Sequence, residues 1–198
     1  GPGDVRVEFD LAVKGDRMTV SYTVINGGSS PVVVFDRRRT PAGDNVAYDP
    51  PVASTRFDQD WFVLALDSRN HRVTLTRGIP KFQFWTHGDL PLGRQLEPGA
   101  GLTDSFETPL PLGMGRWESS GGKGAEVVVR YVAMRIGYIT DIPFDARDRY
   151  RFEIGSEVIW YFPPFAWRWA GEHCVFATSA SQPVEIRVVP PGRQGPPW

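Results

Sequence analysis

The sequence predicts an all-β protein, an antiparallel immunoglobulin-like β-sandwich with long elaborated loops. Short segments that alternate apolar and polar residues recur along the 198 residues, separated by turn-forming residues. The chain also contains 21 glycines and 18 prolines, which favour turns over long helices. No helical periodicity extends beyond about two turns. We expect one sandwich domain over residues 1–190, followed by a Pro/Gly-rich tail at residues 191–198.

Two alternating segments at the start of the chain predict an antiparallel pair of strands. Residues 5–13 carry an apolar side chain at every second position, and residues 17–26 do the same with Met18, Val20, Tyr22 and Val24. Gly15-Asp16 between them predicts a tight hairpin turn. A Gly/Ser/Pro corner at residues 26–31 then breaks the pattern, and the apolar run at residues 32–35 predicts a buried strand.

The middle of the chain alternates between irregular stretches and strand patterns. Residues 37–60 have no period, and we expect a long functional loop there. Strand patterns return at residues 61–66 and 73–75 on either side of a polar turn, and the aromatic residues 81–85 are expected to form an edge strand. A Pro-Gly turn at residues 96–101 leads into another strand candidate.

The second half contains the longest strand candidate, residues 126–139, which we expect at the centre of a sheet. Its alternation places Val127, Val129, Tyr131 and Ala133 on one face. Further strands are expected at residues 156–162, 172–179 and 184–189. The glycine-rich residues 118–124 are expected to form a loop tip.

Four features of the first half resemble a known family. They are a strand that ends in Asn26, a Ser/Pro corner, a later hairpin at residues 62–77, and a Pro-Gly turn before the strand at residues 102–106. This order resembles the bacterial immunoglobulin-like domains typified by the intracellular proteinase inhibitor family. The resemblance implies an immunoglobulin-like fold for this half. It assigns no functional residue, and the second half of this chain is much longer than in that family.

Composition narrows the classes of partner and compartment. The net charge of −1 gives no electrostatic footprint for nucleic acid or an anionic membrane, and no apolar run is long enough for a transmembrane segment. The single cysteine, Cys174, cannot form an intrachain disulfide, and its apolar neighbours predict a buried thiol. We expect a bacterial protein of the periplasm or cell surface, with a signal or anchor removed upstream; the cytoplasm stays open as the alternative.

The densest aromatic stretch of the chain, residues 160–169, is the main candidate binding site. Pro163-Pro164 favours an extended backbone, in which Trp167 and Trp169 would share one face with Arg168 on the other. Such rings can stack on sugars or hold an apolar anchor of a partner protein. The alternative is that Trp160 and Phe162 are core residues and that the two later tryptophans cover the sandwich.

The sequence offers little for metal binding or catalysis. The three histidines lack metal-ligand spacing, and Glu172-His173-Cys174 would alternate faces on a strand. Oxygen-rich residues at 140–150, with Asp141, Asp145 and Asp148, leave calcium as a minor alternative. No nucleophile motif is present, so we expect no cofactor, no metal and no enzymatic activity.

These observations together predict a non-catalytic binding or assembly module that recognises a protein partner. The expected contact residues are Phe165, Trp167, Arg168 and Trp169, and the loop at residues 37–60 is a second candidate face. Its three arginines, residues 37–39, could hold an acidic partner, but a solvated strand end is the favoured interpretation. A carbohydrate-binding module and a proteinase inhibitor acting through an exposed loop at residues 108–113 are the alternatives.

Overall fold

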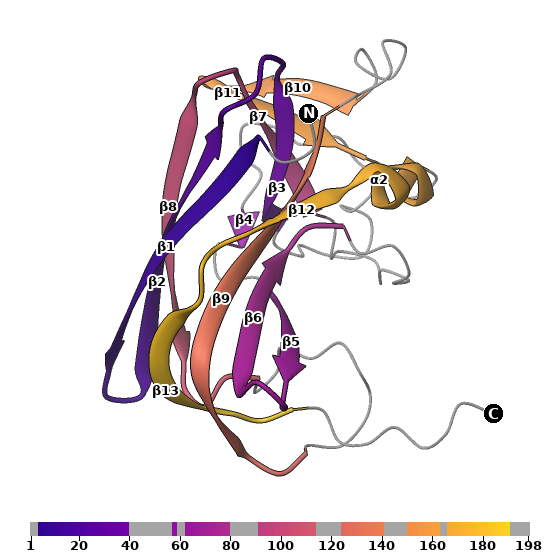
Figure 1. Ribbon diagram of the computed structural model, residues 1–198. Helices are drawn as coiled ribbons and strands as arrows, with labels where there is room; N and C mark the ends of the chain where they lie inside the picture. Colours follow the sequence, from indigo (N-terminus) through magenta and orange to yellow (C-terminus); the bar gives the residue numbers. More distant parts are fainter. Residues whose placement is uncertain are drawn as a thin grey trace, which may run out of the picture.

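Two β-sheets form the protein in the computed structural model, which describes residues 4–39, 57–58, 62–79, 91–113, 124–140, 150–162 and 166–190 (Figure 1). The smaller sheet has three strands in the order β1 (Val5–Lys14), β2 (Arg17–Asn26) and β8 (Gly101–Pro109). The all-β prediction is therefore confirmed. The expected segments at residues 81–85 and 118–123 and the tail at 191–198 lie outside the described residues.

The larger sheet contains the remaining strands. Its main path runs β10 (Arg151–Ile154), β11 (Glu157–Tyr161), β7 (Pro91–Leu96), β3 (Val32–Arg39), β9 (Val127–Ile139), β6 (Arg72–Arg77) and β5 (Val63–Asp67). Three strands pair outside this path: β12 (Val175–Thr178) and β13 (Gln182–Val188) with β9, and β4 (Phe57–Asp58) with β3. Helix α2 (Trp167–His173) lies between β11 and β12 in the chain.

The expectation of a wholly antiparallel sandwich is wrong, because β6 pairs with β9 in parallel. A tight turn forces antiparallel pairing, as it does between β1 and β2 or between β5 and β6. No such turn joins β6 to β9, since β7 and β8 come between them in the chain. The direction of this pair is therefore set by tertiary packing, which alternation along the sequence does not reveal.

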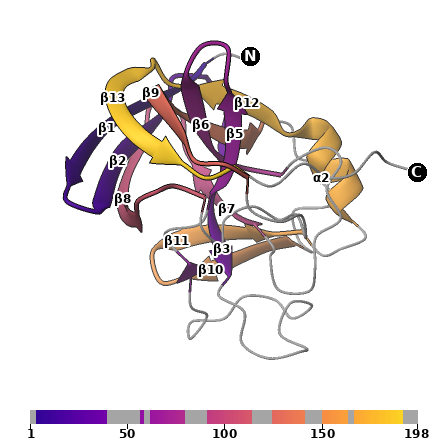
Figure 2. The ribbon, with the colours of Figure 1, turned by 90° about the horizontal axis from the view of Figure 1, so that it is seen from below.

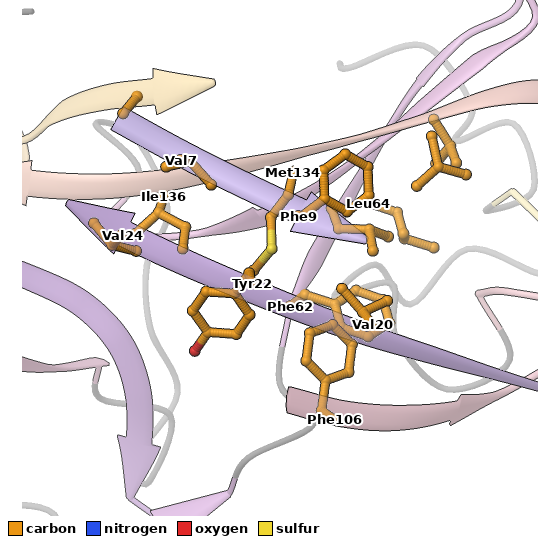
Figure 3. Packing of buried hydrophobic residues seen from close by; sticks show 14 of the residues in the cluster. Val7, Phe9, Val20, Tyr22, Val24, Phe62, Leu64, Phe106, Met134 and Ile136 are labelled. Atoms are coloured by element: carbon orange, nitrogen blue, oxygen red, sulfur yellow. The ribbon is translucent and has the colours of Figure 1, made fainter. Parts of the chain in front are cut away.

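The main core lies between the two sheets, and β1 and β2 contribute one face each (Figure 3). The predicted inward set of β2 is confirmed: Met18, Val20, Tyr22 and Val24 are all at most 1% exposed. Figure 3 shows Val7 and Phe9 of β1, Phe106 of β8, and Met134 and Ile136 of β9 around the same cluster. Burial of this apolar surface is the dominant favourable contribution to folding.

A second core lies on the opposite face of the larger sheet, beneath α2. It contains Val33 and Phe35 of β3, and also Ile79, Ile139, Trp160, Phe162, Ala166, Ala170 and Cys174. Because Val32 and Val34 face the main core, β3 is buried on both sides, which explains its uninterrupted apolar run. Figures 1 and 2 show α2 on the far side of the larger sheet from the β1–β2 hairpin.

Strand β9 is central, as predicted, and pairs with β3, β6, β12 and β13. The predicted inward set fails at Tyr131, which is 45% exposed, whereas Val132 and Met134 face the main core. The positions that face the main core are thus odd-numbered at Val129 and even-numbered from Val132 onward. The register between β9 and β13 shifts in the same region, between Pro183 and Ile186, and such an irregularity re-aims side chains along a strand.

Two further expectations are corrected at segment ends. The strand expected at residues 172–179 begins only at Val175, because Glu172 and His173 belong to α2. The loop expected over residues 37–60 is corrected at two places, because β3 continues to Arg39 and Phe57–Asp58 form β4, which pairs with it; residues 40–56 lie outside the described residues. Strands β7 and β10 were not expected from the sequence, since neither shows a long run of alternating residues.

The corner after β2 is built around the buried side chain of Asn26. Its Nδ2 donates to the carbonyl oxygens of Ser30 at 2.9 Å and Leu96 at 3.0 Å. Its Oδ1 accepts from the backbone N–H of Gly28 at 3.0 Å. One amide therefore joins the Ser/Pro corner to the Pro-Gly turn after β7, two of the features on which the family resemblance rests.

Candidate functional site

The aromatic stretch adopts a helix where the sequence suggested an extended segment. Trp167 is the first residue of α2, and Trp169 lies two positions later. Residues two apart on an α-helix are separated by about 200° around its axis, so these two positions do not share a face. The expected arrangement with Arg168 opposite both tryptophans is therefore wrong. Phe165 lies outside the described residues.

Trp169 is partly buried against the second core. Its ring centroid lies 5.9 Å from that of Phe162, and it stacks on His173 with 4.5 Å between centroids. The His173 Nδ1 also lies 2.8 Å from the Trp169 carbonyl oxygen, so the last turn of α2 is held by side-chain and backbone contacts together. Trp169 thus links the helix to the aromatic residues beneath it.

Arg168 is the most exposed charged residue of α2. Its side chain is 91% exposed, and its Nε lies 3.1 Å from the Glu172 carboxylate one turn later. An exposed pair with this spacing adds only about 0.3–0.5 kcal/mol to helix stability. The guanidinium is therefore available at low cost for contact with another molecule.

The alternative that Trp160 and Phe162 are core residues is confirmed. They are 2% and 1% exposed, and their rings stack with 6.3 Å between centroids. The Trp160 Nε1–H donates to the Gln95 side-chain oxygen at 3.1 Å, which satisfies the buried indole. Phe35 completes the cluster, 5.9 Å from Phe162.

The end of α2 packs tightly against β9. Ala166, Ala170 and Cys174 recur at helical spacing and face the second core, and Cys174 is 2% exposed, as predicted. A Cβ added to Gly137 would lie 2.6 Å from the Cys174 Sγ and 2.9 Å from the backbone of Gly78. The absence of a side chain at Gly137 therefore allows the helix end to approach the sheet.

Sequence reasoning missed a charged network between the two sheets. Asp36 of β3 and Arg77 of β6 are 0% and 1% exposed, respectively. The Arg94 Nε of β7 donates to Asp36 Oδ1 at 3.0 Å, and its Nη2 donates to Oδ2. Tyr22 donates its hydroxyl to the same carboxylate at 3.2 Å, so residues of both sheets converge on Asp36.

Arg77 closes the inner end of this network. Its Nη1 donates to the Tyr22 hydroxyl and to the backbone oxygen of Asp36, each at 2.8 Å. Its guanidinium lies 4.4 Å from the ring centroid of Phe106, at cation–π distance. The guanidinium thus contacts a hydroxyl oxygen, a backbone carbonyl oxygen and the π-face of an aromatic residue of the smaller sheet.

The outer end of the network is Glu157 of β11. Arg37 donates to both carboxylate oxygens, at 2.7 and 3.1 Å, and Arg94 donates to Oε1 at 3.2 Å. The Arg37 side chain is only 14% exposed, and its strand pairs on both sides. The interpretation of Arg37 as a solvated strand end is therefore wrong.

Tyr22 and Arg94 keep their protons near neutral pH. Burial, with the charge of Asp36 beside it, raises the pKa of the Tyr22 hydroxyl far above its ordinary value. Burial alone would lower the pKa of Arg94, but the hydrogen bonds and negative charge of Asp36 outweigh it and raise that pKa. These two groups therefore join strands, and neither is suited to proton transfer.

A strand irregularity places Asp36 in the network. Val34 of β3 pairs with Arg94 of β7, and Arg37 pairs with Leu92. Three residues along β3 therefore correspond to two along β7, and this register shift lies at Gly93. A Cβ at Gly93 would lie 2.1 Å from a methyl group of Val33, so glycine is required there. The available sequence signal was an Asp directly after an apolar run, but its partners Tyr22, Arg77 and Arg94 lie 14 to 58 positions away, beyond the reach of local patterns.

The segment considered for proteinase inhibition is partly buried and hydrogen-bonded along its backbone. Thr108 and Leu112 are each 1% exposed. Leu112 donates its backbone N–H to Arg187 and accepts from Val189, at 2.9 and 2.7 Å, and Leu110 donates to Asp16 at 2.7 Å. Within residues 108–113 only Pro109 is exposed, and the use of this segment in proteinase inhibition stays a prediction.

Comparison with protein-family models, with curated proteins and with solved structures finds no match for this chain. Within the described ranges, no group of three His, Cys, Asp or Glu side chains is arranged to hold a metal ion. The candidate calcium residues 141–149 lie outside those ranges. In the part of the chain that the structure describes, no helix is both long and apolar enough to cross a membrane.

Proposed function

We propose that this chain is an immunoglobulin-like β-sandwich that acts as a non-catalytic binding or assembly module. It recognises a protein partner through the surface of α2, with Arg168 and Trp169 as the described contact residues; Trp167 and Phe165 are the other proposed contact residues from the same sequence stretch. The observation that carries the proposal is the docking of α2: its small residues face the second core, while Arg168 extends into solvent.

Two physical arguments support this surface. Arg and Trp are the residue types enriched among the energetic centres of protein interfaces. A helix already fixed to the sheet by Trp169, Ala170 and Cys174 loses little conformational freedom when a partner binds. The charged network supports the non-catalytic part of the proposal. The pKa values of Tyr22 and Arg94 lie far from neutrality, so these two groups join the sheets and are not suited to proton transfer.

The proposal includes a place in the periplasm or at the surface of a bacterium. A reduced buried thiol is compatible with that compartment, since Cys174 is 2% exposed and, as the single cysteine of the sequence, forms no intrachain disulfide. Fractionation of cells that express the tagged full-length protein measures this directly. Recovery in the cytoplasmic fraction alone contradicts the placement.

A capture experiment tests the surface. The tagged protein, its Arg168→Glu variant and a Lys14→Glu control are exposed to native cell extract, and retained proteins are identified by mass spectrometry. Both variants change the net charge equally, but Lys14 ends β1 on the far side of the molecule from α2 (Figure 2). A protein held by the wild type and the control but lost by Arg168→Glu is the expected result.

Two outcomes contradict the proposal. One is a retained set that is identical for wild type and Arg168→Glu. The other is capture of no protein, together with a shift in tryptophan fluorescence on addition of soluble polysaccharides. The second outcome favours the carbohydrate-binding alternative, which would use the same rings.

A further inference from the structure

Strand β1 forms one edge of the smaller sheet, since among the described strands it pairs with β2 alone. Its odd-numbered residues are buried as far as Phe9, whereas Leu11 is only partly buried and Val13 is 41% exposed. Figure 2 shows this end of the β1–β2 hairpin at the periphery of the molecule. An exposed edge presents N–H and C=O groups to which another strand can pair.

Two hydrogen bonds show which backbone groups of β1 face this edge. The carbonyl oxygen of Asp4 accepts from the N–H of Gly27 at 2.8 Å and therefore points towards β2. The carbonyl oxygen of Phe9 accepts from Gln182 Nε2 of the larger sheet at 3.2 Å and points the other way. Because this direction alternates along a strand, the even-numbered residues of β1 pair with β2 and the odd-numbered residues face the edge. Beyond Phe9, the edge is thus formed by the backbone of residues 11 and 13.

The side chains on the solvent face of this segment are self-complementary. Asp10, Ala12 and Lys14 share that face, with a negative charge at one end, a positive charge at the other and a small residue midway. In the part of the chain that the structure describes, no ion pair involves Asp10 or Lys14. Lys14 lies directly opposite Arg17 of β2, and like charges in this position are destabilising. A carboxylate supplied by another molecule would offset that repulsion.

We propose that this edge is a self-association site, at which residues 10–14 of two copies of the chain pair as antiparallel strands about a twofold axis at Ala12. In this register Asp10 of each copy lies opposite Lys14 of the other. Leu11 of each copy lies opposite Val13 of the other, and because both residues face the edge they exchange N–H to C=O hydrogen bonds. Their side chains meet on the face away from the charges and cover the exposed Val13. The two smaller sheets then form one continuous sheet.

Charge and backbone direction together select this register. Pairing centred on Asp10 would place the two Asp10 carboxylates directly opposite each other. Pairing centred on Leu11 would need the backbone of Phe9, whose carbonyl oxygen already accepts from Gln182. A centre beyond Ala12 would lose the ion pairs between the copies. Pairing centred on Ala12 keeps both ion pairs and leaves the Phe9 carbonyl with its partner.

Sedimentation equilibrium of the purified full chain tests the proposal. The contact is short, so we expect a weak dimer, with an average mass that rises from 22.1 kDa towards twice this value as the concentration approaches about 1 mM. Asp10→Lys and Lys14→Asp each turn the attractive pairs into repulsive ones and should weaken dimerisation about tenfold. Asp10→Lys combined with Lys14→Asp exchanges the charges and should restore wild-type association. Glu153→Lys of β10 is the control, since its side chain is 71% exposed at another sheet edge.

A further variant tests the backbone pairing without a change of charge. The Val13 N–H faces the edge, so Val13→Pro removes a donor to the second copy and none to β2. We expect this variant to keep its circular dichroism spectrum and to remain monomeric. A wild type that stays at 22.1 kDa throughout the concentration range overturns the proposal. Failure of the exchanged double variant to recover, or a dimer that persists in folded Val13→Pro, overturns it equally.

These outcomes are independent of the proposed function of α2. Self-association is measured on the purified protein, without extract or partner. Lys14→Asp should lose self-association and still capture the same partner, because the α2 surface is unchanged. Arg168→Glu should lose the partner and still dimerise as the wild type does. Failure of either proposal therefore leaves the measurement of the other unaffected.

Discussion

The substitution Asp36→Asn removes one negative charge from the interior while it leaves the side-chain volume almost unchanged. Asp36 is 0% exposed and accepts two hydrogen bonds from Arg94 and one from Tyr22. Loss of this charge leaves Arg94, whose side chain is 11% exposed, with the more distant carboxylates of Asp104 and Glu157. Removal of one partner from a buried ion pair costs about 3–5 kcal/mol, which is the expected loss of unfolding free energy.

Urea denaturation followed by circular dichroism measures this cost. The control is Arg17→Gln, which breaks the ion pair between Arg17 and Glu107. These two side chains are 47% and 52% exposed, so we expect a loss of unfolding free energy of about 1 kcal/mol or less. Replacing both buried partners, as Asp36→Asn with Arg94→Met, should recover part of the loss because the buried Arg94 charge that Asp36 compensated is then removed as well. A cost for Asp36→Asn that does not exceed the cost for Arg17→Gln would refute the reasoning.

Three further predictions concern the fold. Burial raises the pKa of the Tyr22 hydroxyl in the folded protein, so the protonated hydroxyl stabilises the fold fully below about pH 10, and this stabilisation is lost as the pH rises further. Tyr22→Phe should therefore flatten the fall in unfolding free energy that denaturation measures between about pH 9 and pH 11. Asn26→Ala leaves the carbonyl groups of Ser30 and Leu96 without their donor and should lower the unfolding free energy by about 2–3 kcal/mol in urea titrations, and an unchanged midpoint would contradict this. Gly137→Ala should cost about 1–3 kcal/mol through its clash with Cys174, whereas Gly101→Ala, with 3.6 Å to its nearest atom, should cost less in the same thermal melts.

The elements predicted from the sequence are those whose signal is local. Alternation predicted β1 and β2, the dense apolar run at residues 126–139 predicted the central strand β9, and Gly15 predicted the hairpin turn, because each signal depends on residues close together in the chain. The parallel pairing of β6 with β9 could not be predicted in this way. It depends on which distant strands pack together, a choice made by the whole core.

The candidate site shows the same division. The aromatic density that drew attention to residues 160–169 does mark a cluster around Phe162. Its local backbone was misjudged because Pro163-Pro164 outweighed the spacing of Ala166, Ala170 and Cys174, which signals a helix face. The charged network was missed altogether, since its arginines look like ordinary surface residues until the strands that carry them are placed side by side.

The most direct test of the account places a photo-crosslinking amino acid at position 168 of the full-length protein in its native cells. The same substitution at position 14 is the control. The account predicts one protein cross-linked from position 168 and absent from position 14, because Arg168 is 91% exposed on α2 and Lys14 lies at the end of β1. Identical products from both positions, or no protein product from position 168, would contradict the claim that α2 is the recognition surface.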